Sequence, residues 1–120
     1  MNFKSYEKQA ILRLLAGMSF ADGNASAIED RLFVAFMHKL GVTNGDILAS
    51  KNMSDSKACS IAKGLSCEQK RLVSALLASI MLVDGKVENS ELLTLTAICA
   101  KCDIPVLDPN EVHVVLNRYL

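Results

Sequence analysis

The stretch FADGNASAIE (residues 20–29) is followed 62 positions later by a similar stretch, LVDGKVENSE (residues 82–91). Each stretch places Asp-Gly directly after an apolar segment and a glutamate seven residues beyond that aspartate. Four further identities keep the same spacing: Leu15, Ala16, Ala35 and Lys39 fall on Leu77, Ala78, Ala97 and Lys101. We therefore expect the chain to contain one helix–turn–helix unit twice.

The composition favours one helical domain over residues 1–120. Hydrophobic residues make up 51% of the chain and aromatic residues only 5%, which suits a core of aliphatic side chains. Thirteen basic residues balance thirteen acidic ones, so no net field attracts nucleic acid or an anionic membrane. Because few rings are present for bases to stack on, we expect no binding of nucleic acid.

The apolar segments are too short for a signal peptide or a membrane span. The first twenty residues, MNFKSYEKQAILRLLAGMSF, carry scattered charges and lack a long apolar stretch with a small-residue cleavage site. The longest apolar run, residues 72–83, is well below the roughly 20 residues that cross a bilayer. We expect a cytosolic protein in which this run is a helix buried on nearly all sides.

Helix start and stop signals predict about seven helices, two of them short. The expected ranges are 5–20, 27–40, 44–48, 55–63, 67–82, 91–102 and 109–119. The start signals are the capping boxes Ser26/Glu29 and Ser66/Gln69 and the single caps Thr43, Ser54 and Asp108. Gly41 and Pro105 are expected to end the second and sixth helices. The predicted fold is all-α: two hairpins docked about a pseudo-twofold axis, with residues 43–65 as the connector.

This pattern resembles the TerB-like (tellurite resistance protein B) domain family. The shared features are an apolar helix ending in Ala-Asp-Gly at residues 21–23, a short loop, a glutamate one turn into the next helix, and the duplication of this unit. The resemblance covers residues 6–119. It implies an all-α fold, a role as a small stress-response module, and acidic residues that hold a divalent cation. The second copy departs from the pattern at Val83, and Lys86 brings a positive charge close to Asp84.

The acidic residues of both copies are the candidate metal ligands. The resemblance implies a set at Asp22, Glu29, Asp84 and Glu91, and pooling of the two turns near the axis would add Glu88. Carboxylates gathered in this way repel one another unless a cation or a proton neutralises them. The cations considered are calcium, manganese and zinc. The spacing excludes an EF-hand, since Glu29 comes four residues too early.

A purely structural role accounts for the same motif. Gly23 and Gly85 follow helix ends, where a left-handed conformation favours glycine. Asp22 and Asp84 can accept hydrogen bonds from N–H groups of the loop backbone. Glutamates near helix starts, such as Glu29, are stabilised by the helix dipole. Both readings stay open at this stage.

The four cysteines offer a different metal site. Cys99 and Cys102 form a CxxC motif that Cys59 and Cys67 could complete as a four-thiolate zinc site. Against this, the motif lies at the end of its helix and no second CxxC exists. Cys67, in a first helical turn, is expected to be the most reactive thiol, and Cys99 is expected to fill the core. His38 and His113 are expected to be isolated surface or core residues.

Two functions remain, and neither is enzymatic, because no catalytic or nucleotide-binding motif is present. The first is a cation-binding stress-response module whose hairpin packing is read by a partner. The second is a metal-free helical interaction domain that presents a surface to a membrane-associated or chaperone complex. No HPD motif of a J-domain occurs in the chain, so a stand-alone domain is expected.

Overall fold

Helix α5 (Cys67–Leu82) lies at the centre of the fold because ten consecutive residues, Leu72 to Met81, are buried. The computed structural model describes residues 2–19, 27–82 and 89–119, with residues 19 and 27–33 described by their backbone alone. Burial on every side of a helix requires apolar or small residues all round it, and residues 72–81 are all of that kind. The prediction of a helix buried on nearly all sides is confirmed.

Seven helices and no strand are present in the described part of the chain. They are α1 (Ser5–Ser19), α2 (Ala27–Leu40), α3 (Asn44–Lys51), α4 (Asp55–Lys63), α5, α6 (Asn89–Cys102) and α7 (Pro109–Tyr119). The predicted all-α fold with two short helices is confirmed, since α3 and α4 have 8 and 9 residues. None of the described helices has the length and apolarity needed to cross a membrane.

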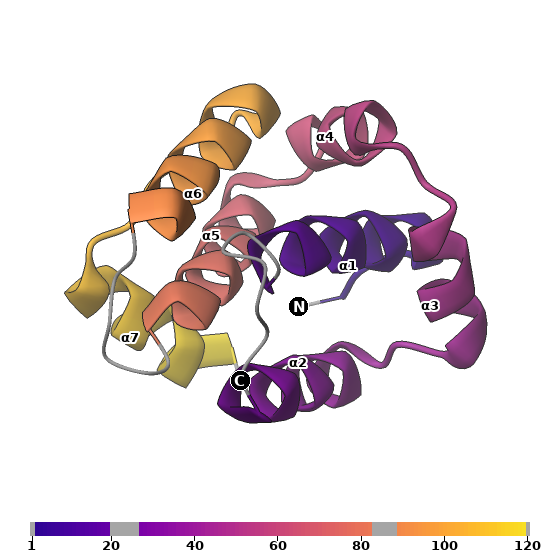
Figure 1. Cartoon of the computed structure of the whole chain (residues 1–120), viewed down its shortest axis with the longest axis horizontal. Helices are drawn as coiled ribbons and strands as arrows, with labels where there is room; N and C mark the ends of the chain where they lie inside the picture. Colours follow the sequence, from indigo (N-terminus) through magenta and orange to yellow (C-terminus); the bar gives the residue numbers. More distant parts are fainter. Residues whose placement is uncertain (1, 20–26, 83–88, 120) are drawn as a thin grey trace.

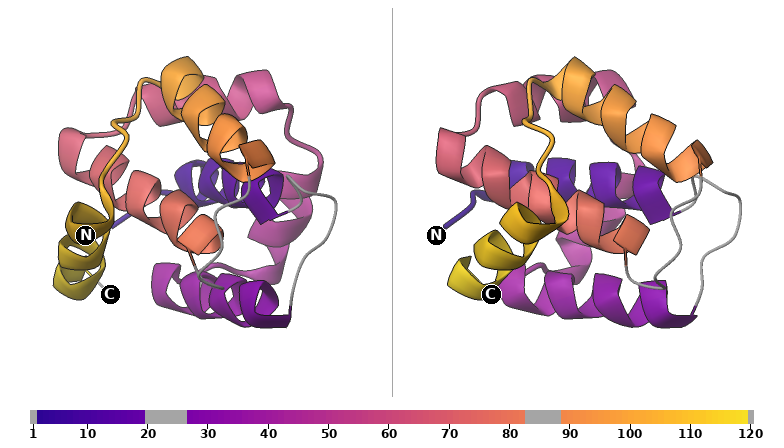
Figure 2. Two further views of the ribbon diagram at one scale, coloured as in Figure 1. Left: turned by 60° about the vertical axis from the view of Figure 1, so that its left-hand side comes forward. Right: turned by 90° about the vertical axis from the view of Figure 1, so that its left-hand side faces the viewer.

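The helices are arranged in layers around the pair α1 and α5 (Figures 1 and 2). Helices α4 and α6 lie on one side of this pair and contact each other. Helix α2 covers the opposite side and contacts both α1 and α5. Helix α7 packs on α5, and α3 packs on α1. Helix α4 thus contacts a helix from each half of the chain.

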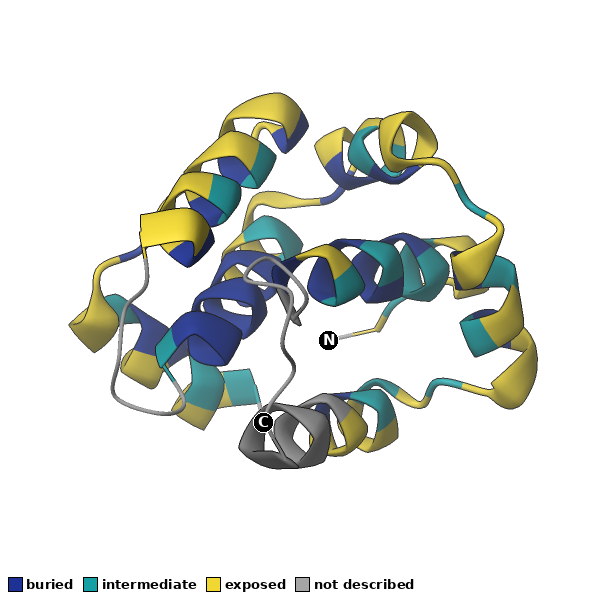
Figure 3. Cartoon of the chain, viewed as in Figure 1, coloured by how far each residue is buried: buried dark blue, intermediate teal, exposed yellow. Residues whose placement is uncertain are grey.

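The hydrophobic core is centred on α1 and α5, where Figure 3 shows buried residues concentrated. Helix α1 buries residues at helical spacing: Ala10, Ile11, Leu12, Leu14, Leu15 and Met18. The outer helices each bury one stripe, which is why Phe36 of α2 and Leu95 of α6 are buried beside exposed neighbours. Full burial of one such side chain stabilises the fold by roughly 1.5–3 kcal/mol.

Local hydrogen bonds start the helices where the caps were predicted. The Ser66 and Gln69 side chains each accept a hydrogen bond from the other residue's backbone N–H, at 3.1 and 2.9 Å, which completes a capping box. Thr43 and Asp46 form a second box at the start of α3. The predicted caps Ser54 and Asp108 accept from Lys57 N and Glu111 N. The predicted box at Ser26 and Glu29 lies outside the residues whose side chains the structure describes.

Helices α2 and α6 end in the same way. Gly41 and Asp103 directly follow them with φ of 69° and 55°, in the left-handed region. The next residue then donates its N–H to a carbonyl five positions back, Val42 to Met37 at 3.0 Å and Ile104 to Cys99 at 2.9 Å. This is the Schellman arrangement, which satisfies carbonyls at a helix end.

Candidate functional site

The described residues contain one side chain of the predicted acidic set. Glu91 lies in the first turn of α6 and is 4% exposed. Glu29 is the third residue of α2, but its side chain is not described. Asp22, Asp84 and Glu88 lie outside the described residues. The predicted pooling of the five carboxylates therefore stays a prediction.

The position of Glu91 gives its carboxylate an unusual environment. As the third residue of α6, it lies where the N–H groups at a helix start favour an anion. Glu91 already has an interaction within the chain. Because burial lowers the local dielectric, a charge placed next to this carboxylate acts on it more strongly than at the surface. Cation binding is therefore best tested at Glu91, the residue of the predicted acidic set whose side chain the structure describes.

The four-cysteine zinc site predicted as an alternative is wrong. All four cysteines are described and free, and no three histidine, cysteine, aspartate or glutamate side chains among the described residues are placed to hold a metal ion. Cys67 is exposed at the start of α5, while Cys99 and Cys102 are buried on α6. The prediction that Cys99 fills the core is confirmed.

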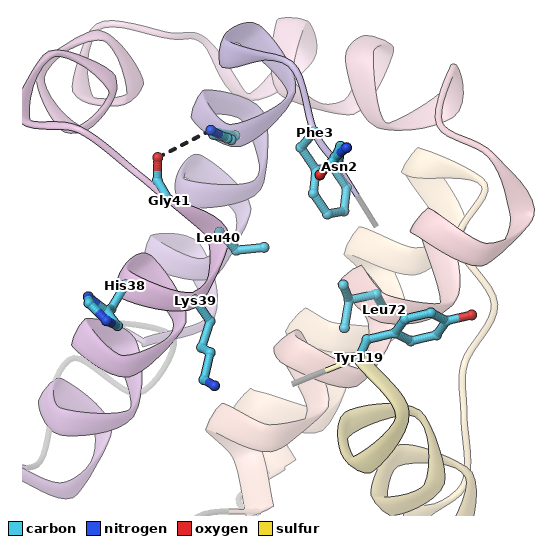
Figure 4. Close-up of a pocket in the computed structure, with 9 residues that line it drawn as sticks. Asn2, Phe3, His38, Lys39, Leu40, Gly41, Leu72 and Tyr119 are labelled. Carbon is cyan, nitrogen blue, oxygen red and sulfur yellow. Dashed lines mark hydrogen bonds between the residues drawn. The ribbon is translucent and has the colours of Figure 1, made fainter.

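A cavity of about 280 Å³ lies where the C-terminal end of α2 meets the N-terminal segment, α5 and α7 (Figure 4). Its lining is Asn2, Phe3, Lys8, His38, Lys39, Leu40, Gly41, Leu72 and Tyr119. Lys8 donates from Nζ to Gly41 O at 3.2 Å, and His38 and Lys39 occupy the last turn of α2. Cations at a helix C-terminus complement the helix dipole, so the basic lining is explained by the stability of α2. No sequence pattern points to this cavity, because its residues are far apart in the chain.

Helix α6 exposes an apolar surface. Leu92 is 45% exposed and Leu93 70%, and Val106, in the segment after α6, is 57% exposed. An open depression of about 450 Å³ is lined by Thr96, Cys99, Ala100, Asp103, Ile104, Pro105 and Val106. Exposed apolar side chains that form a patch often mark a protein interface. His38 and His113, which were expected to be surface or core residues, are both exposed at the surface.

The fold is shared with a protein from Porphyromonas gingivalis W83. The crystal structure of that protein, which is described as being of unknown function, superposes on this chain with a TM-score of 0.86. The match covers 98% of this chain and 92% of the other, with 25% sequence identity. No protein-family model and no curated protein matches the chain. The similarity therefore establishes the arrangement of the helices and carries no activity with it.

Proposed function

We propose that the chain is a duplicated, TerB-like helical domain. The bounds of its helices support the duplication, because α2 and α6 end 62 residues apart and α1 and α5 begin 62 residues apart. Their left-handed C-terminal residues, Gly41 and Asp103, have the same offset. The six buried positions of α1 also correspond at this offset to buried positions of α5. Chance agreement at so many levels is hard to obtain without a repeat.

The packing of the helices favours a pseudo-twofold relation between the halves. Such an axis exchanges α1 with α5 and α2 with α6, so each contact between the halves needs a counterpart. Helix α1 contacts α6, and α5 contacts α2. The contacts α1–α2 and α5–α6 form the second matched pair. Helix α4 has no counterpart in this scheme and belongs to the connector.

The function we propose is binding of a divalent cation by the acidic residues at the two helix starts, in a small cytosolic stress-response module. The observation that carries this proposal is the burial of Glu91 at the start of α6. The repeat places Glu29 at the equivalent point of α2, and Asp22, Asp84 and Glu88 precede these two helix starts in the sequence. A cation bound there would neutralise carboxylates from both halves. We assign the chain no catalytic role, and tellurite resistance itself does not follow from the fold.

Calorimetric titration of chelator-treated protein with calcium, manganese and zinc tests this function. We expect one of the three ions to give saturable heat and to raise the melting temperature, since binding to the native state alone stabilises it. Glu91→Gln, Asp22→Asn and Asp84→Asn should each weaken that ion's binding at least tenfold. Glu68→Gln is the matched control, because Glu68 lies in the first turn of α5 but is exposed.

Two results would reject cation binding. The first is wild-type protein that gives neither heat nor a melting shift with any of the three ions. The second is an ion whose affinity is unchanged in Glu91→Gln, provided that the variant is folded by circular dichroism. Because Glu91 already has interactions within the chain, a lower melting temperature of the variant without ions does not bear on the proposal.

A metal-free interaction domain is the second candidate, and the exposed apolar residues of α6 favour it. Leu92 and Leu93 correspond in the repeat to Asp30 and Arg31, so only the second half carries an apolar pair at these positions. A scaffold whose copies differ at one surface is suited to a single helical protein partner, in a chaperone or membrane-associated complex. Leu93→Asp should abolish co-purification of such a partner. Val34→Asp, which changes an exposed residue of α2, should not. Equal recovery with both variants would remove this surface from consideration.

A further inference from the structure

Three of the four thiols lie on α4 and α6, two helices that pack against each other. Cys59 comes from α4, and Cys99 and Cys102 come from the last turns of α6. Cys102 is fully buried and Cys99 is 2% exposed, while Cys59 is only partly buried. The contact therefore joins one thiol that is reachable from solvent to one that is not.

Cys59 and Cys102 are direct partners. The two thiols are close enough for Cys59 to act on the ionisation of Cys102. Burial, followed by this interaction with Cys59, raises the pKa of Cys102 to about 12. Cys99 is instead linked to Ser74 of α5, and burial raises its pKa as well. Cys102 thus faces α4, while Cys99 faces α5.

Cys59 is accessible through a cavity of about 350 Å³. The other residues of this cavity are Asp55, Ser56, Ser60, Lys63 and Lys101, so two ammonium groups lie around the thiol. Asp55 is paired with Arg13 of α1 at 3.0 Å, which draws its charge toward that partner. The thiolate of a cysteine is the form that reacts with peroxide. The cavity gives an oxidant access to Cys59 and not to Cys102.

We propose that Cys59 and Cys102 form a reversible disulfide when the protein meets hydrogen peroxide. In the first step the Cys59 thiolate attacks one peroxide oxygen, the O–O bond breaks, and Cys59 sulfenic acid and hydroxide result. In the second step Cys102 sulfur attacks Cys59 sulfur, the S–O bond breaks, and the second oxygen leaves as water with the Cys102 proton. Two thiols are oxidised and one peroxide is reduced to two waters. A dithiol such as dithiothreitol reverses the reaction by exchange.

The first step prepares the second. Oxidation converts a thiolate at Cys59 into a neutral sulfenic acid, so the negative charge that opposes ionisation of Cys102 is removed. The packing of α4 on α6 brings Cys59 and Cys102 into interaction, and a buried resolving thiol is shielded from further oxidants. The product links α4 to α6 and closes the chain between residues 59 and 102, which restrains the unfolded state.

Peroxide treatment of the full chain, followed by alkylation of the remaining thiols and peptide mass spectrometry, tests the proposal. We expect a Cys59–Cys102 linked peptide, with Cys67 and Cys99 still alkylated. The oxidised protein should melt at a higher temperature, and dithiothreitol should return it to the starting value. Cys67→Ser, which alters an exposed thiol, is the control that should behave like wild type.

Cys59→Ser should abolish both the linked peptide and the melting shift. Cys102→Ala should leave Cys59 without a resolving thiol, so that Cys59 accumulates as sulfinic or sulfonic acid. The proposal is overturned if wild-type protein links Cys59 to Cys99, forms chiefly intermolecular Cys67 disulfides, or over-oxidises Cys59 without a bridge. It is also overturned if all four thiols can still be alkylated after peroxide treatment. Cys59→Ser removes a partly exposed thiol, so it tests the bridge without emptying a core position.

Discussion

Replacement of Leu77 by alanine should cost the fold about 3–5 kcal/mol of unfolding free energy. Leu77 lies on α5 with no exposed surface, so the substitution removes three carbon atoms that are wholly buried. At about 0.8 kcal/mol for each buried carbon, the transfer contribution is about 2.4 kcal/mol. The cavity left behind adds to this, because α5 is enclosed by α1, α2, α6 and α7 and its surroundings can collapse little. A domain of this size is stable by roughly 5–15 kcal/mol, so the variant should fold with a small margin.

Urea unfolding followed by circular dichroism measures this cost. The midpoint should fall while the slope with denaturant stays the same, because the surface exposed on unfolding hardly changes. Leu15→Ala, at the equivalent position of α1 and also without exposed surface, should cost a similar amount. Leu93→Ala is the matched control, since a leucine that is 70% exposed should change stability by less than about 0.5 kcal/mol. A loss below about 1 kcal/mol for Leu77→Ala would refute the central placement of α5.

Two further predictions concern the ends of the outer helices. Gly41→Ala should destabilise the protein by about 1 kcal/mol in urea unfolding, because alanine is strained at a φ of 69°. The added Cβ meets only Lys8 Nζ, at 3.7 Å, so the cost comes from the backbone conformation and not from a clash. An unchanged unfolding midpoint would contradict the left-handed end of α2. Hydrogen bonds from the Thr43 backbone and from Gln9 hold the pKa of Asp46 below its ordinary value of 3.8. The Asp46 carboxylate therefore stabilises the fold above pH 3.8, and this stabilisation is lost as the pH falls through the lowered pKa. Asp46→Asn should therefore reduce the loss of stability as the pH falls below about 4, and an acid unfolding profile that is identical in the variant and in wild type would contradict this assignment.

Features that depend on neighbouring residues were predictable from the sequence. The Ser66/Gln69 box and the Thr43 cap work across three residues, so the residue types and their spacing suffice to place them. The end of α6 was predicted from Pro105, but the left-handed conformation of Asp103 was not, since residues other than glycine adopt this conformation only occasionally. The number and order of helices followed from such local signals.

Contacts between distant residues were not predictable in the same way. The four-thiolate site failed because Cys67 starts α5 at an exposed position, while Cys99 and Cys102 lie on the buried stripe of α6. The Cys59–Cys102 contact depends on α4, which lies in the connector and has no counterpart in the repeat to suggest where it packs. The burial of Glu91 also depends on packing, since a glutamate at a helix start is usually exposed.

The two proposals concern opposite ends of α6 and can be tested independently. Glu91 lies in the first turn and Cys102 is the last residue, eleven positions later, which at 1.5 Å per residue separates them by about 16 Å. At this distance the two sites share no side chain, so neither change alters the groups of the other site by direct contact. Any coupling would require α6 to move as a rigid body against α4 and α5. A cation that binds equally well to reduced and disulfide-linked protein would show that α6 does not transmit the change, and it would leave each site to be judged on its own experiment.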